Sequence, residues 1–65
     1  MVSVLLVDDS EYFRDLLAAL LLGAGHKVVG EATSGDEAVE KYQKLTPEVC
    51  IVVRHFGLIK LIKRQ

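Results

Sequence analysis

The chain has few of the residues that cross-link small proteins. Its 65 residues include one cysteine, one proline and no tryptophan. The single cysteine excludes an intramolecular disulfide, and Cys50, His26 and His55 are too widely separated to resemble clustered zinc ligands. A domain of this length buries only about 60% of the surface that its unfolded chain exposes. Stability must therefore come from side-chain packing or from association with another chain.

Long hydrophobic runs are also absent. The longest fully apolar stretch, Leu16–Leu22, is far short of the roughly 20 residues that a membrane-spanning helix needs. The N-terminus, MVSVLLVDD, lacks the basic start of a secretory signal and turns acidic at once. The composition, 51% hydrophobic and 26% charged, is that of a globular protein. We therefore expect one cytoplasmic domain with a reduced cysteine and no membrane partner.

Positive charge is scarce until the C-terminal segment. Residues 1–53 carry four basic residues against nine acidic ones, a net charge of −5, whereas residues 54–65 have no acid and a net charge of +4. A basic segment of this kind is usually a solvated face. It could also dock on an acidic surface of another copy or bind nucleic acid. The acidic remainder of the chain counts against nucleic acid.

Strand and helix patterns alternate along the chain. Three short apolar runs, Val2–Val7, His26–Ala32 and Val49–Val53, predict strands. Helices are predicted at about Glu11–Leu22 and Gly35–Leu45. A third helix is predicted from about Leu58 to the end, because a strand would scatter the charges of GLIKLIKRQ over both faces. The order βαβαβα predicts an α/β fold with a short parallel sheet.

The two longer predicted helices carry end signals and apolar faces. Ser34 and Glu37 fit a capping box, and Gly23 and Gly25 fit a C-cap and turn. Pairing of Glu37 with Lys41 and of Glu40 with Lys44 has the favourable i, i+4 orientation. The residues predicted to share a buried face are Phe13, Leu16, Leu17, Leu20 and Leu21 in the first helix, and Ala38, Val39, Tyr42 and Leu45 in the second.

The strand ends are where an open α/β sheet places its sites. Asp8 and Asp9 end the first strand, and adjacent carboxylates there either hold a hard cation such as Mg²⁺ or cap the next helix. The third strand ends at Val53, which supplies no carboxylate, hydroxyl or thiol. Cys50 lies within an apolar run and is expected to be a core thiol. A nucleophilic enzyme is not predicted.

The order and spacing of these residues resemble a known family. VLLVDDSEYFRDLL, GHKVVGEATSGDEAVEKY and PEVCIVV resemble the N-terminal half of a response-regulator receiver domain, the CheY-like family of two-component phosphorelay signalling. The resemblance implies a flavodoxin-like fold with strand order 2-1-3 for the part present. In that family a histidine kinase donates a phosphoryl group to an Asp ending the third strand, with Mg²⁺ held by this Asp and the acidic pair.

The chain departs from the family at the acceptor position. By motif, Asp8 and Asp9 correspond to the metal-binding acids. The family places its acceptor Asp after Pro-Asp and four mostly apolar residues, whereas here Pro47-Glu48 and four apolar residues lead to Val53. We therefore predict no catalytic residue, no required cofactor, at most a weak vestigial Mg²⁺ site, and no phosphoryl acceptor. The divergent segment 54–65 reflects either a shortened loop before a third helix or a frameshift.

A 2-1-3 sheet would leave the third strand as an uncovered apolar edge. We therefore predict a homo-oligomer, most simply a two-fold dimer, that pairs edge to edge through the third strand or exchanges elements between copies. The predicted interface residues are Val49, Ile51, Val53, Leu17, Leu20 and Leu21. Two functions stay open: a phosphorylation-incompetent relic or interaction module that contacts two-component signalling proteins, and an adaptor or nucleic-acid-binding oligomer that uses the basic segment.

Overall fold

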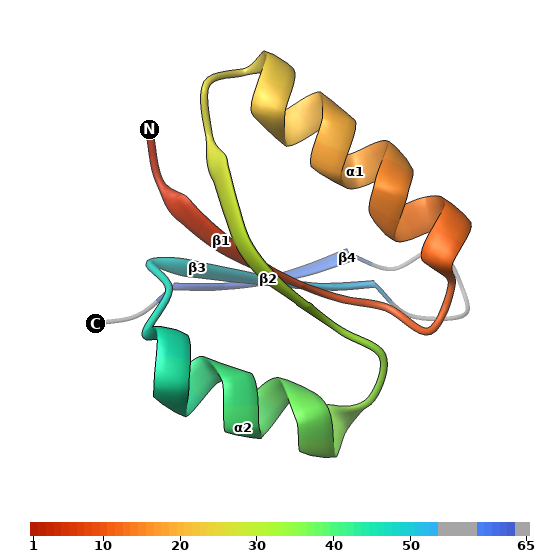
Figure 1. Cartoon of the computed structure of the whole chain (residues 1–65), viewed down its shortest axis with the longest axis vertical. Coiled ribbons are helices and arrows are strands. Elements are labelled where there is room, and N and C mark those ends of the chain that lie inside the picture. Colours follow the sequence, from red (N-terminus) through yellow and green to blue (C-terminus); the bar gives the residue numbers. More distant parts are fainter. Residues whose placement is uncertain (54–58, 64–65) are drawn as a thin grey trace.

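A computed structural model of the chain describes residues 1–53 and 59–63. The elements are β1 (Ser3–Val7), α1 (Glu11–Gly23), β2 (Lys27–Ala32), α2 (Gly35–Leu45), β3 (Val49–Val53) and β4 (Ile59–Lys63) (Figure 1). They form one sheet of order β2-β1-β3-β4, in which β1 pairs in parallel with both β2 and β3. The predicted α/β architecture with a parallel 2-1-3 sheet is confirmed. No helix in the described ranges is long and apolar enough to cross a membrane.

The central strand β1 supplies half of the buried apolar residues because its side chains alternate between two covered faces. Leu5 and Val7 belong to a cluster on the α2 side that includes Ala32 and Cys50. Val4 and Leu6 belong to a second cluster, which packs against α1. The two helices lie on opposite sides of the sheet, as Figure 1 shows. An apolar run without alternation therefore corresponds to a strand buried on both faces.

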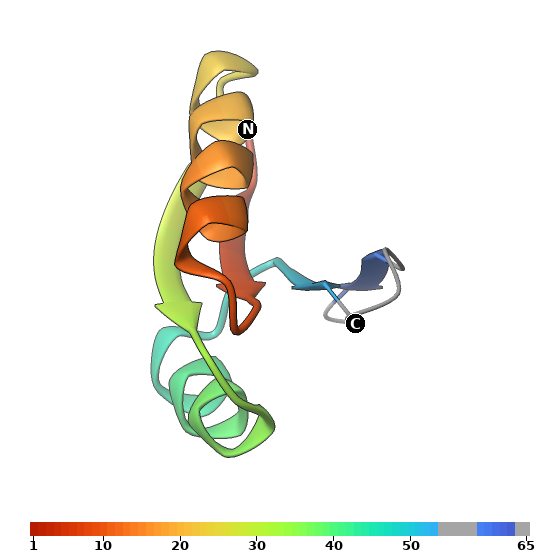
Figure 2. The same cartoon turned by 90° about the vertical axis from the view of Figure 1, so that its right-hand side faces the viewer.

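The helices cover only part of the sheet. Both pack mainly on β1 and β2, whereas β3 pairs with β1 on one side and with β4 on the other, and β3 and β4 project to one side of the helices (Figure 2). The α1 side of β3 still contributes to the core, since Val49 is buried with Val4 and Leu6 and Ile51 packs against them. The chain thus has a well-covered half and a half that bears no helix among the described residues.

The helix faces differ from the predicted ones. In α1, Leu17 and Leu21 pack on the core together with Ala18, whereas Leu16 and Leu20 are 47% and 63% exposed. The prediction that all five apolar residues of α1 share a buried face was therefore wrong. The partly buried Arg14 takes one of the inward positions, so the buried stripe is rotated. In α2, Ala38 and Tyr42 pack on the core, but Val39 and Leu45 are exposed.

The local end signals were predicted well. The hydroxyl oxygens of Ser10 and Ser34 accept hydrogen bonds from the backbone N–H groups three residues later, at 3.3 and 3.2 Å. The Glu37 carboxylate accepts from the backbone N–H of Thr33 at 2.7 Å rather than from that of Ser34, so the capping box is displaced by one residue. Gly25 has φ +87°, in the left-handed region that favours glycine.

The prediction of a C-terminal helix was wrong over residues 59–63. This segment is β4, which pairs antiparallel with β3 from Val53 opposite Ile59 to Val49 opposite Lys63. A helix of about eight residues is marginal in water, whereas pairing with β3 satisfies backbone groups that an uncovered edge would leave open. The remainder of the predicted helix, Leu58 and residues 64–65, lies outside the described residues.

The same pairing corrects the expected uncovered edge. Strand β3 lies between β1 and β4, and its residues Val49 and Val53 are both only 8% exposed. The outer strands of the sheet are β2 and β4. A second copy is therefore not needed to cover β3, and the predicted pairing of two copies through this strand loses its physical basis. Oligomerisation through another surface stays a prediction.

Candidate functional site at the strand ends

Asp8 is held at the carboxyl end of β1 by the backbone. Its N–H donates to the carbonyl of Ala32, the last residue of β2, at 3.0 Å. The residue is only 6% exposed, and Oδ2 has no hydrogen-bond partner among the described residues. An unpaired buried carboxylate oxygen is costly. Asp8 is therefore the residue of the predicted acidic pair whose buried Oδ2 is placed to accept a cation or a water molecule.

Asp9 and Ser10 take different positions from Asp8. Asp9 is exposed, and Ser10 caps α1 through its side-chain oxygen. The sequence left open whether the adjacent carboxylates cap the helix, and the structure gives that role to Ser10. The carboxylates sit at the start of α1, where the helix dipole favours negative charge.

Val53 lies beside Asp8 at the same edge of the sheet. Val7 pairs with Val52 in the parallel ladder, so the next residues, Asp8 and Val53, are neighbours across strands that lie about 4.8 Å apart. The structure therefore brings together the two positions that the sequence singled out. Val53 is 8% exposed and presents only methyl groups. This edge carries an acid on one strand and an apolar side chain on the next.

The residues at this edge fit a magnesium ion incompletely. Mg²⁺ requires near-octahedral oxygen coordination and gives up its water ligands reluctantly. Within residues 1–53 and 59–63, no three His, Cys, Asp or Glu side chains are grouped closely enough to hold a metal ion. The orphaned oxygen of Asp8 suits a cation, but Val53 cannot contribute an oxygen ligand. The donor set is that of a weak site at most.

Cys50 is not part of a reactive centre. It lies in β3 and is buried in the α2-side core with Leu5 and Ala32. Burial raises the pKa of its thiol. Because the thiolate is the nucleophilic form, a buried thiol with a raised pKa is a core residue, as the sequence predicted.

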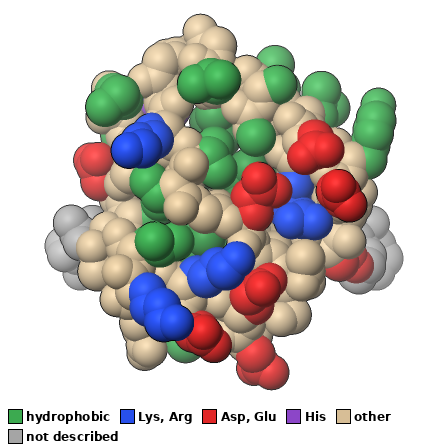
Figure 3. Space-filling view, in the orientation of Figure 1, with side chains coloured by type: hydrophobic (Ala, Val, Ile, Leu, Met, Phe, Trp, Pro, Cys, Tyr) green, Lys and Arg blue, Asp and Glu red, His purple; other side chains and the backbone are tan. Residues whose placement is uncertain are grey.

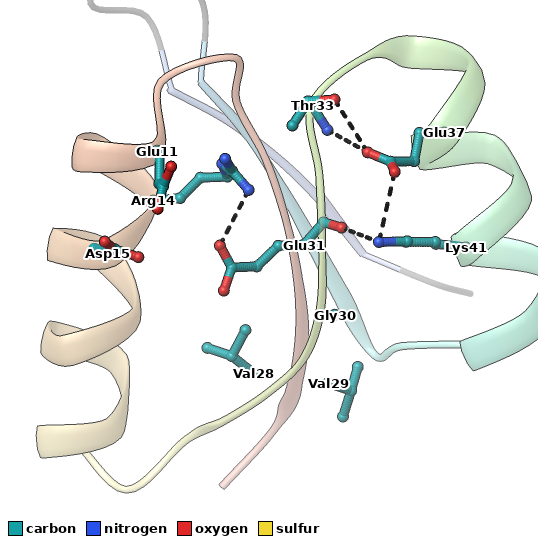
Figure 4. Close-up of a pocket in the computed structure, with 10 residues that line it drawn as sticks. All are labelled: Glu11, Arg14, Asp15, Val28, Val29, Gly30, Glu31, Thr33, Glu37 and Lys41. Atoms are coloured by element: carbon teal, nitrogen blue, oxygen red, sulfur yellow. Dashed lines mark hydrogen bonds and ion pairs between the residues drawn. The ribbon is translucent and has the colours of Figure 1, made fainter.

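A charged cavity at the outer edge of β2 was not foreseen from the sequence (Figure 4). It has a volume of about 480 Å³ and lies between α1, β2 and α2. Arg14 reaches from α1 to the carboxylate of Glu31 at 3.3 Å, and Lys41 reaches from α2 to the backbone carbonyl of Glu31. Charged side chains thus flank an exposed strand edge and hinder pairing with another strand. Their separation along the chain hides this arrangement from local sequence patterns.

Glu37 borders this cavity and is strongly hydrogen-bonded. The backbone N–H of Thr33 holds the pKa of the Glu37 carboxyl below its ordinary value, with help from the Thr33 hydroxyl and Lys41. The i, i+4 ion pairs Glu37–Lys41 and Glu40–Lys44 are confirmed at 3.7 and 3.3 Å. These contacts fix the first turn of α2 and the turn before it. They serve the fold rather than a reaction.

Comparison with known proteins identifies chemotaxis proteins and a protein-glutamate methylesterase as relatives, although no family model matches the chain. Over 46 residues the chain is 50% identical to the chemotaxis protein CheY of Thermotoga maritima and 39% identical to that of Bacillus subtilis, covering 71% of this chain and 38% of each relative. It is also 50% identical over 50 residues to protein-glutamate methylesterase/protein-glutamine glutaminase 4 of Geobacter metallireducens, covering 75% of this chain and 14% of that protein. The chain spans about two fifths of the length of the CheY relatives.

Proposed function

We propose that this chain, which is related to the N-terminal part of the CheY-like receiver domains, is an interaction module of two-component signalling that accepts no phosphoryl group. The observation that carries the proposal is the pairing of Val7 with Val52, which sets Val53 beside Asp8. At the position where the family has its acceptor carboxylate, the chain presents methyl groups. The proposal also implies that the chain has no catalytic activity of its own.

Phosphoryl transfer to a protein requires a nucleophilic atom, and the acid nearest to Val53 along the chain does not reach its position. Glu48 is the last acidic residue in the sequence. It lies just before β3, where its backbone N–H donates to the Ser3 hydroxyl at 2.9 Å and its carboxylate accepts from the Ser3 N–H at 3.2 Å. Roughly five residues of extended chain separate it from Val53, a distance of about 16 Å.

The proposed role depends on a surface that other proteins can bind and not on a chemical reaction. The β1–α1–β2–α2 unit packs around the residues that carry the family likeness, and half of its aligned positions match a CheY protein. A folded unit of this kind can compete with complete receivers for proteins that recognise their N-terminal half. The proposed role is therefore that of a decoy or assembly unit, with partners among two-component signalling proteins.

The proposal is tested by exposing the 65-residue chain to Mg²⁺ and a small phosphodonor such as acetyl phosphate, then recording its intact mass. We expect no added phosphoryl group, while a complete receiver with its acceptor aspartate gains one under the same conditions. A stable phosphoaspartate at Asp8 or Asp9 would overturn the proposal. The partner role is tested by asking whether excess chain slows phosphoryl transfer from a histidine kinase to the complete receiver; no slowing at any excess argues against a decoy.

A further inference from the structure

The outward face of α1 carries a stripe of large apolar side chains. Tyr12, Leu16 and Leu20 follow one another at intervals of four residues and are 81%, 47% and 63% exposed. Residues at this spacing lie one above the other on a helix. Several separate hydrophobic side chains are exposed along the upper and right-hand rim of the molecule, where α1 lies (Figures 1 and 3). A contiguous exposed stripe of this kind is typical of an interaction surface.

The stripe occupies the side of α1 that faces away from β2. Arg14 lines the charged cavity together with β2 residues, and Ala18 and Leu22 line an apolar cavity that also includes Val28 of β2. At 3.6 residues per turn, the side chains of Tyr12, Leu16 and Leu20 point to the opposite flank. That flank faces the half of the sheet on which no described helix packs. The stripe is therefore open to a partner.

The charges of α1 favour one orientation for the α1 helix of a second copy. Glu11, Arg14 and Asp15 lie in the N-terminal part of the helix, and no charged residue follows from Leu16 to Gly23. Two copies that cross antiparallel near residue 18 keep the Asp15 carboxylates roughly 9 Å apart along the helix axis and the Glu11 carboxylates roughly 21 Å apart. A parallel pair would place like charges side by side.

The sizes of the α1 side chains also favour the antiparallel arrangement of two copies. In the antiparallel arrangement Leu16 of one copy meets Leu20 of the other, and the bulky Tyr12 lies opposite Ala24 of the second copy, the C-cap residue of α1, whose side chain is small. Ala19, also exposed, lies near the crossing point, where a small residue lets two helices approach closely. The stripe is thus complementary to itself in shape, and the antiparallel arrangement keeps like charges apart, as a two-fold interface requires.

We propose that Tyr12, Leu16 and Leu20 form a docking surface for α1 of a second copy, in an antiparallel two-fold pair. The inference rests on the proposed function, because a module without phosphoryl chemistry acts through contacts. It revises the interface predicted from the sequence. Leu20 is kept, whereas Leu17 and Leu21 pack on the chain's own core and β3 is occupied by β4.

The first test is the mass of the full 65-residue chain in solution across a dilution series, measured by sedimentation. We expect a dimer that dissociates on dilution. Leu20→Lys should raise the dimer dissociation constant at least about tenfold while the circular dichroism spectrum is unchanged, because Leu20 is outside the core. Leu22→Lys is the matched control: Leu22 is 73% exposed on the same helix but on the β2 flank, so its substitution should leave the dissociation constant unchanged.

The second test probes the antiparallel geometry by mixing two variants. Leu16→Glu and Leu20→Lys should each weaken self-association. Their mixture should associate more strongly than either alone, because an antiparallel heterodimer aligns the introduced glutamate with the introduced lysine and keeps one Leu–Leu contact. A parallel pair offers neither gain, so a mixture no tighter than its components would refute the arrangement.

The proposed docking surface would be refuted if the wild-type chain stayed monomeric at all concentrations. It would also be refuted if the Leu22→Lys variant dissociated as readily as Leu20→Lys. These outcomes are separate from the phosphorylation test. If the chain is monomeric and gains no phosphoryl group, the proposed docking surface is refuted and the proposed function is not. If the chain is dimeric and becomes phosphorylated, the proposed function is refuted and the docking surface is not.

Discussion

Restoring an acid at Val53 tests the reasoning about the strand-end site. The substitution Val53→Asp replaces a side chain that is 8% exposed and lies next in register to the buried Asp8. It removes about 1.5 to 2 kcal/mol of apolar burial. It also adds a second carboxylate to a poorly solvated edge, which brings the cost to about 3 to 5 kcal/mol. A small domain has a total stability of similar size, so the variant should be largely unfolded in the absence of divalent cations.

Magnesium should reverse this loss because the variant supplies the oxygen ligand that Val53 cannot. A ligand that binds only the folded state adds about 1.4 kcal/mol to the free energy of unfolding for each tenfold rise in its concentration above the dissociation constant. We therefore expect Val53→Asp to gain stability steeply with Mg²⁺. The wild-type chain, with Asp8 and Asp9 alone, should gain less than about 0.5 kcal/mol over the same range.

The measurement is urea unfolding followed by circular dichroism over a roughly hundredfold range of Mg²⁺, with ionic strength held constant by sodium chloride. Val53→Asn is the matched control, since it has nearly the same shape as the aspartate variant but no charge, and its response to Mg²⁺ should be much smaller. Equal stabilisation of the wild-type chain and Val53→Asp would refute the reasoning. It would mean that the acidic pair holds Mg²⁺ without a third carboxylate.

Two further predictions follow from the perturbed pKa values. Burial of Cys50 in β3 and the raised pKa of its thiol should make its reaction with an aromatic disulfide at least about a hundredfold slower in the native chain than in urea; equal rates would show that β3 is accessible. For Glu37, whose pKa is lowered in the fold, the stabilising contribution is fully present above the unfolded-state pKa and is lost as pH falls through the lower, folded-state pKa. The unfolding free energy should thus decrease below about pH 4.5, and Glu37→Gln should reduce the steepness of this decrease. Glu40→Gln, which leaves the Thr33 contact intact, should not; the same slope in all three chains would contradict the assignment.

Local signals explain why most elements were predicted closely. The bounds of α2 and β3 agree with the predicted ranges, and β1, α1 and β2 differ by a residue or so. Helix starts are set by short-range hydrogen bonds such as those to Ser10 and Ser34, which depend on residues three positions apart. Buried parallel strands are recognisable because β-branched residues run without alternation. These signals act within a few residues and can be read without the fold.

Interactions between distant segments explain why the buried face of α1 and the C-terminal segment were predicted wrongly. Amphipathic spacing in α1 allowed several leucines to face inward, but the surface of β1 and β2 selected Leu17 and Leu21 and left Leu16 and Leu20 exposed. The tail sequence is compatible with a helix face, but the unpaired N–H and C=O groups of β3 favour a strand there. Arg14 and Glu31 meet across two elements, which no local pattern indicates.

The sequence by itself determined which functional groups the described strands can offer. The prediction that the acceptor carboxylate is missing depends on the sequence alone, because Val53 has only methyl groups and no tertiary arrangement can add an oxygen to that side chain. Only the tertiary structure decided which surfaces are free. A strand edge pairs with whichever segment reaches it, and the sheet fixes the rotation of a helix packed on it. The leucines that the rotation of α1 leaves exposed are the basis for the proposed contact between copies.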